Sequence, residues 1–145
     1  MEQIIANDIL SGKWTYRSFH NNPAPVGDNA EAALALIFAE AEFTFQLGSG
    51  NDLQGIIDWG SGGLDLTGAI RPASAGVPLG VAIVGLGRPG SQTDGWEYDY
   101  NANLAFEWPN GVKQIPALVG TVIRARPHGS APAGYVASFI AVKQL

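Results

Sequence analysis

Ser11-Gly12-Lys13-Trp14-Thr15-Tyr16, residues 11–16, is the stretch of sequence that decides the fold of this chain. It opens a run over 12–20 in which alternate side chains share one face of a predicted strand, namely Trp14, Tyr16, Ser18 and His20. About seven more strand-like runs follow, with glycine-rich turns between them and no long amphipathic helix. The pattern predicts an all-β fold, a single antiparallel up-and-down barrel of about eight strands.

The later strands are expected at 39–47, 53–59, 64–70, 79–86, 96–106, within 117–126, and at 135–142. Short turns such as Gly48-Ser49-Gly50-Asn51-Asp52 favour antiparallel pairing between neighbours in the sequence. At 145 residues the chain is expected to form one domain, 1–145. A short apolar patch, Ile4-Ile5 with Ile9-Leu10, is expected to form one helical turn under the barrel.

A short helix is expected between the first two strands. Asp28-Asn29-Ala30-Glu31 has the spacing of a capping box, in which Asp28 accepts a hydrogen bond from the Glu31 amide. The residues after it share a helical face, so one or two turns are expected, packed at one end of the barrel: Ala30, Ala33, Leu34 and Ile37. The alternative is a long strand from Ala33 onward.

Composition excludes several classes of partner. Thirteen acidic against eight basic residues give a net charge of −5 without a block of like charge, so no nucleic-acid partner is expected. The longest apolar runs, 32–39 and 77–86, are shorter than the ~20 residues of a membrane span, so no membrane partner is expected. The absence of cysteine excludes disulfides and thiolate chemistry. The start lacks signal-peptide features, so a cytoplasmic location is expected, with a mature periplasmic or secreted form as the alternative.

Gly12-Lys13-Trp14 at the start of the first strand, after a short apolar turn and before a β-meander, resembles the calycins, the lipocalin-like and avidin-like barrels. The resemblance implies that Trp14 is a structural plug at one end of the barrel, beneath an arginine near the last strand. Arg124 and Arg126 are the two candidates for that arginine. The ligand contacts of avidin-type proteins have no recognisable counterpart, and biotin binding is not predicted.

The barrel interior is expected to be rich in aromatic rings. The 96–106 run alternates most clearly and places these side chains inward: Trp96, Tyr98, Tyr100, Ala102, Leu104 and Phe106. The predicted ligand-binding residues are Tyr16, Ser18, Phe43, Phe45, Trp59, Tyr98, Tyr100 and Arg124. Such a lining suits a small apolar or aromatic molecule with one or two polar groups, and binding of such a molecule is the expected function. The alternative is that the rings simply fill the barrel.

An enzyme of the same architecture is the second hypothesis, an isomerase, cyclase or hydrolase acting on a small apolar substrate. Allene oxide cyclases show that calycin-like barrels support catalysis. The candidate catalytic residues are Asp58, Arg124 and His20, because an inward ionisable group could act as an acid, a base or an anion contact. With His20 and His128 as the only histidines, a three-histidine zinc site is excluded, and neither a metal nor a cofactor is expected.

Two further patterns bear on cofactors and assembly. The run Gly85 to Gly90 matches G-x-G-x-x-G, but turn-forming residues follow instead of the helix that a dinucleotide site requires. The last two strands carry apolar residues on both faces, which favours a homodimer or higher homo-oligomer through them: Val119, Val122, Ile123, Val136, Phe139, Ile140 and Val142.

Overall fold

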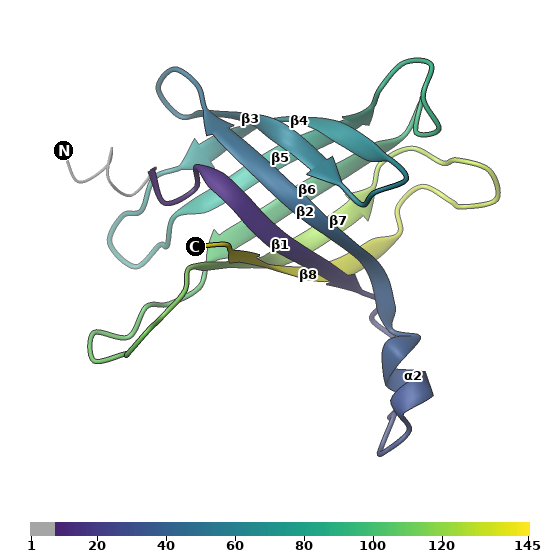
Figure 1. Cartoon of the computed structure of the whole chain (residues 1–145), viewed down its shortest axis with the longest axis horizontal. Helices are drawn as coiled ribbons and strands as arrows, with labels where there is room; N and C mark the ends of the chain where they lie inside the picture. Colours follow the sequence, from purple (N-terminus) through teal and green to yellow (C-terminus); the bar gives the residue numbers. More distant parts are fainter. Residues whose placement is uncertain (1–7) are drawn as a thin grey trace.

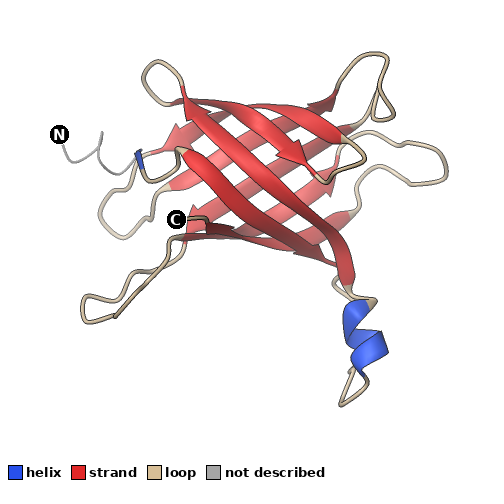
Figure 2. Cartoon of the chain, viewed as in Figure 1, coloured by secondary structure: helices blue, strands red, loops and turns tan. Residues whose placement is uncertain are grey.

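A computed structural model describes residues 8–145 and shows a closed, eight-stranded antiparallel barrel in which every strand pairs with its neighbours in sequence. Figures 1 and 2 show the strands wrapping around one axis, with β1 closing onto β8. The strands are β1 (Gly12–Phe19), β2 (Ile37–Leu47), β3 (Asp52–Asp58), β4 (Gly63–Arg71), β5 (Gly80–Gly87), β6 (Glu97–Leu104), β7 (Ala117–Arg124) and β8 (Val136–Lys143). The predicted fold class is confirmed.

The one short helix between β1 and β2 is α2 (Ala30–Leu34). Its N-cap is Asn29, whose side chain accepts a hydrogen bond from the Ala32 amide, so the predicted capping by Asp28 is wrong by one residue. The helix projects away from the barrel and buries none of its residues, which contradicts the expected packing at the barrel end (Figure 1). One helical turn precedes β2 as expected, whereas the alternative of a strand from Ala33 is wrong because Ala33 and Leu34 are helical. β2 begins at Ile37, earlier than the expected residue 39.

One half of the barrel is filled by large side chains around Trp14. Trp14 is fully buried, and its indole Nε1 donates a 3.0 Å hydrogen bond to the Leu10 carbonyl oxygen. Leu10, also fully buried, belongs to the same core, whereas Ile4 and Ile5 lie outside the described residues. Aromatic rings continue the filling, with centroids 4.8 Å apart for Phe43 and Phe45 and 5.0 Å apart for Phe43 and Tyr16. We call this half the tryptophan end.

The arginine expected above Trp14 is not there. Arg124 ends β7 at the opposite end of the barrel, and Arg126 lies beyond it in an ion pair with Glu97. The cation on the last strand beside Trp14 is Lys143, which pairs with Trp14 in register and donates to the Ile9 carbonyl oxygen at 2.6 Å. The prediction that Arg124 or Arg126 covers the tryptophan is therefore wrong.

Strand β6 ends earlier than its alternation suggests. The ladder to β7 stops after Leu104, and the chain leaves the sheet through Ala105, whose amide bonds the Ala117 carbonyl. Phe106 is 70% exposed in the following loop, in edge-to-face contact with Trp108, so its predicted inward placement is wrong. Proline soon afterwards, at Pro109, removes an amide that a continuing strand would need.

Close approach between strands explains glycine at one inward position. A Cβ on Gly120 of β7 would lie 1.8 Å from the Asn101 carbonyl oxygen of β6, so only a residue without a side chain fits there. Within residues 8–145, no helix has the length and apolar character needed to cross a membrane.

Candidate functional site

The end of the barrel opposite Trp14 contains a cavity of about 260 Å³. The loops over 88–95 and 125–134 flank this open end (Figure 1). For scale, a dry cavity of about 150 Å³ holds benzene, so this one has room for an aromatic ring with substituents. Its lining comes from five strands and the loops beside them: Tyr16, Phe38, Ala39, Ile57, Trp59, Trp96, Tyr98, Tyr100, Val122, Arg124 and His128.

Three parallel rings form one wall of the cavity. Trp59, just after β3, stacks on Trp96, just before β6, with centroids 6.2 Å apart and planes 17° apart. Trp96 stacks in turn on the His128 imidazole, with centroids 3.7 Å apart and planes 10° apart. Flat rings fixed in this way offer a large apolar contact at low entropic cost, which suits a planar ligand.

Arg124 is the buried charge of the cavity and is only 8% exposed. Its Nε donates to the Tyr98 hydroxyl at 2.9 Å, and its Nη1 donates to the Pro132 carbonyl oxygen at 3.1 Å. The guanidinium carbon lies 5.2 Å from the Tyr135 ring centroid and 5.7 Å from those of Phe38 and Tyr98, within cation–π range. Neutral groups and aromatic rings therefore hold the cation in one position.

Tyr98 connects Arg124 to His128. Arginine nitrogens only donate, so the Tyr98 oxygen accepts from Nε of Arg124. The same hydroxyl is hydrogen-bonded to Nε2 of His128, 2.8 Å away, and donates its hydrogen there in the tautomer in which Nε2 carries none. Burial, with a smaller contribution from the nearby Arg124 charge, lowers the pKa of His128 below its ordinary value. The imidazole is therefore neutral at neutral pH and can accept that hydrogen.

A second histidine–tyrosine pair lies beside the cavity. Nδ1 of His20 and the Tyr135 hydroxyl form a hydrogen bond between the end of β1 and the start of β8. The Phe38 ring packs against both, at 5.0 Å from His20 and 5.6 Å from Tyr135. His20 is not part of the cavity lining. The His20–Tyr135 pair instead packs against Phe38, which does line the cavity.

Five of the eight predicted ligand-binding residues line the cavity together: Tyr16, Trp59, Tyr98, Tyr100 and Arg124. Phe43 and Phe45 instead fill the tryptophan end. Ser18 is fully buried outside the lining. Its hydroxyl makes no hydrogen bond of normal geometry.

Of the candidate catalytic residues, only Arg124 lines the cavity. Asp58 is exposed, and its carboxylate accepts a 2.8 Å hydrogen bond from the Gly60 amide in the turn after β3, so it does not point inward. Residues 8–145 contain no group of three or more His, Asp or Glu side chains arranged to hold a metal ion.

Sequence reasoning missed Phe38 and His128 as lining residues. Ser18 pairs with Ala39 and Phe19 pairs with Ile37, so Phe38 is an extra residue at a bulge, where strict alternation no longer assigns a face. His128 belongs to a loop held by paired hydrogen bonds with Ala131, and no periodicity encodes its position. Trp96 was already expected to point inward.

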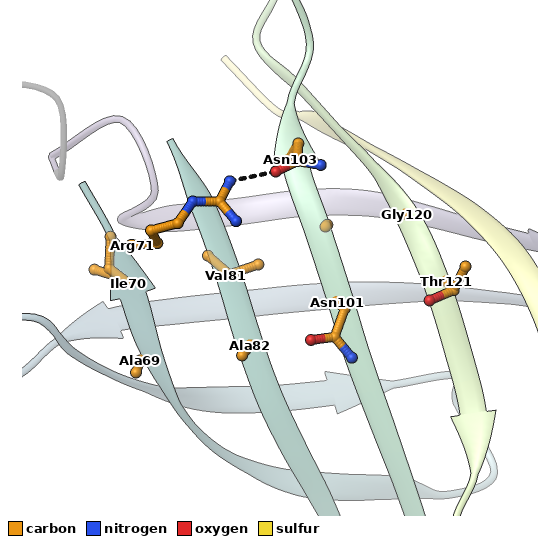
Figure 3. A pocket seen from close by; sticks show the side chains of 10 residues that line it. Ala69, Ile70, Arg71, Val81, Ala82, Asn101, Asn103, Gly120 and Thr121 are labelled. Atoms are coloured by element: carbon orange, nitrogen blue, oxygen red, sulfur yellow. Dashed lines mark hydrogen bonds between the residues drawn. The ribbon is translucent and has the colours of Figure 1, made fainter. Parts of the chain in front are cut away.

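A larger hollow, about 540 Å³, lies on the outer wall of the barrel over β4 to β7 (Figure 3). It exists because small side chains stand in a row across the strands, including Ala69 and Ala82. Its cation, Arg71, already donates to the Asn103 amide oxygen and to the Pro78 carbonyl oxygen. It has neither aromatic lining nor a buried charge, so the open-end cavity is the better candidate site.

In comparisons with protein-family models, with curated proteins and with solved structures, the chain gives no match.

Proposed function

We propose that this protein binds a small aromatic or apolar molecule in the open-end cavity. The observation that carries the proposal is the contrast between the two halves of the barrel. Large rings fill the tryptophan end, whereas the open end keeps about 260 Å³ between stacked tryptophans and buried tyrosines. An apolar cavity with few, well-placed polar groups is the usual form of a small-molecule site.

Filling the cavity tests this proposal. Ala39 lines it, and we expect Ala39→Phe to abolish binding of a neutral aromatic probe, naphthylmethanol, followed by the emission of Trp59 and Trp96. The matched control is Ala82→Phe, the same change on the exposed outer wall, which should leave the titration unchanged. Absence of any saturable response of the unmodified protein both to naphthylmethanol and to its carboxylate counterpart, naphthoate, would contradict the proposal.

Native mass spectrometry of protein purified from its own cells provides the complementary measurement. A retained small molecule that is absent from Ala39→Phe would identify the ligand directly.

The second candidate function is catalysis by the same cavity, an isomerase, cyclase or hydrolase reaction. It is favoured by the chain from Arg124 through Tyr98 to His128, which places a neutral base and a hydroxyl beside a fixed positive charge. Turnover of a bound aromatic ester that is lost in His128→Gln, with probe binding retained, would favour the enzyme over the binding protein.

Membership in the calycin group is also a proposal. It is supported by Gly12 and Trp14 at the start of β1 and by the closed eight-stranded barrel. The replacement of the expected arginine by Lys143 beside Trp14 departs from the pattern that the resemblance implies.

A further inference from the structure

Arg124 is more than nine-tenths buried and has no acidic partner in the described part of the chain. The ion pairs there involve Lys13, Arg17, Arg88 and Arg126, not Arg124. Both of its hydrogen-bond acceptors, the Tyr98 hydroxyl and the Pro132 carbonyl, are neutral. Removing a cation from water without a counter-charge is costly, and an anionic ligand bound beside Arg124 would offset that cost.

The guanidinium also keeps donors to offer. Arginine has five N–H groups, and the hydrogen bonds to Tyr98 and Pro132 use two of them, which leaves three on Nη1 and Nη2. Ring contacts with Phe38, Tyr98 and Tyr135 fix its position without using those donors. A planar cation held in this way is suited to the two oxygens of a carboxylate.

The cavity carries one positive charge. Among the lining residues that the structure describes, Arg124 is the only lysine or arginine, and the lowered pKa of His128 keeps that imidazole neutral at neutral pH. A single charge matches a monoanion better than a phosphate ester with two. The stacked Trp59 and Trp96 rings in the same cavity are suited to the planar remainder of the ligand.

Resting on the function proposed above, we propose that the ligand is an aromatic carboxylate, its carboxylate on the free N–H groups of Arg124 and its ring against the Trp59–Trp96 wall. Arg124 is then the specificity-determining residue. It distinguishes an aromatic acid from a neutral molecule of the same shape.

The test compares two probes of nearly equal size, naphthoate and naphthylmethanol, in a buffer free of other carboxylates. We expect the unmodified protein to bind naphthoate at least about tenfold more tightly, as measured by tryptophan emission and by calorimetry. Arg124→Gln should reduce this ratio to about one by weakening naphthoate alone. The control, Arg126→Gln, removes an exposed arginine paired with Glu97 and should keep the full preference.

Each outcome is decisive. Equal affinity of the unmodified protein for both probes overturns the carboxylate inference and leaves the proposed binding function standing. Failure of both probes to bind overturns that function as well. Because the comparison in the unmodified protein needs no substitution, it holds even if Arg124→Gln folds poorly after losing its contacts with Tyr98 and Pro132.

Discussion

Asp99 is a side chain whose surroundings disfavour the charged carboxylate form. It lies on the outer face of β6, opposite Val84 of β5 and Ile123 of β7 in register, and its Oδ1 atom is buried without a hydrogen-bond partner. Burial, followed by the neighbouring Glu97, raises the pKa of Asp99 from 3.8 to about 6. The native state therefore binds a proton here more readily than the unfolded chain does.

This pKa sets the direction of a pH dependence. Because the folded pKa is raised, the favourable contribution of Asp99 is present below about pH 4 and is lost as the pH rises through about 6. We expect Asp99→Asn to raise the free energy of unfolding by about 1 kcal/mol near pH 7.5, after allowance for solvent screening, and to change it little near pH 4.

Urea unfolding at the two pH values measures the difference. Asp28→Asn removes the same charge from an exposed loop position and provides the control. A gain that is equal at both pH values would show that the pKa of Asp99 is not the cause.

At the scale of the strands, two inward glycines differ in their nearest neighbours: Gly120 lies against backbone atoms and Gly85 against side chains. At Gly120 of β7 an added Cβ would collide with a carbonyl oxygen of β6, whereas at Gly85 of β5 its nearest neighbours are the ends of the Leu64 and Leu66 side chains, 3.0 and 3.1 Å away. Side chains can adjust to such a contact, but two hydrogen-bonded strands have little room to separate.

We therefore expect Gly120→Ala to destabilise the barrel by about 3 kcal/mol or more, and Gly85→Ala by about 1 kcal/mol. Thermal unfolding followed by circular dichroism measures both. Equal losses in the two variants would contradict the assigned difference between backbone and side-chain contacts.

The strands also show which inward residues sequence periodicity predicts and which it does not. Alternation predicted that Tyr16, Tyr98 and Tyr100 share the interior, and they line one cavity, because pleating fixes the face of every residue in a regular strand. It could not place Phe38, since a bulge inserts that residue between paired positions. Alternation wrongly placed Phe106 inward. An apolar residue at this position continues the alternating sequence pattern, although the hydrogen-bonded ladder to β7 has already ended at Leu104.

Tertiary contacts account for the remaining omissions. Whether Arg124 or Arg126 faces inward depends on where β7 ends, and the path of the 125–134 loop decides that His128 stacks on Trp96. Neither fact has a local sequence signal. The position of the imidazole and the inward orientation of Arg124 therefore had to come from the structure, although Arg124 itself and most of the aromatic wall were predicted from the sequence.

At the scale of the whole molecule, the outer surface is not uniformly polar. Val119 on β7 is 48% exposed, and Val136 and Ile140 on β8 are 43% and 39% exposed. Val119 and Ile140 are direct neighbours in register, with Ala117 and Val142 as the next outward pair along the two strands. We propose that this surface mediates the homodimer expected from the sequence.

Light scattering coupled to gel filtration tests the assembly. We expect a dimer for the unmodified protein and a monomer for Ile140→Lys, because the substitution would bury a charge at the contact. Leu86→Lys, on the exposed face of β5 between Asp65 and Glu97, is the control and should remain dimeric. A monomeric unmodified protein at micromolar concentration would remove the proposal.

The side chains packed around Trp14 close one end of the barrel, so the cavity does not continue through to that end. Trp14, Phe43 and Phe45 are at most 1% exposed, so nothing can thread through from one end to the other. On the proposed binding function, a ligand would enter and leave by the same opening, and a long alkyl tail would extend into water. We therefore expect the depth of this cavity to favour short, compact ligands over extended lipids, independently of any polar contact.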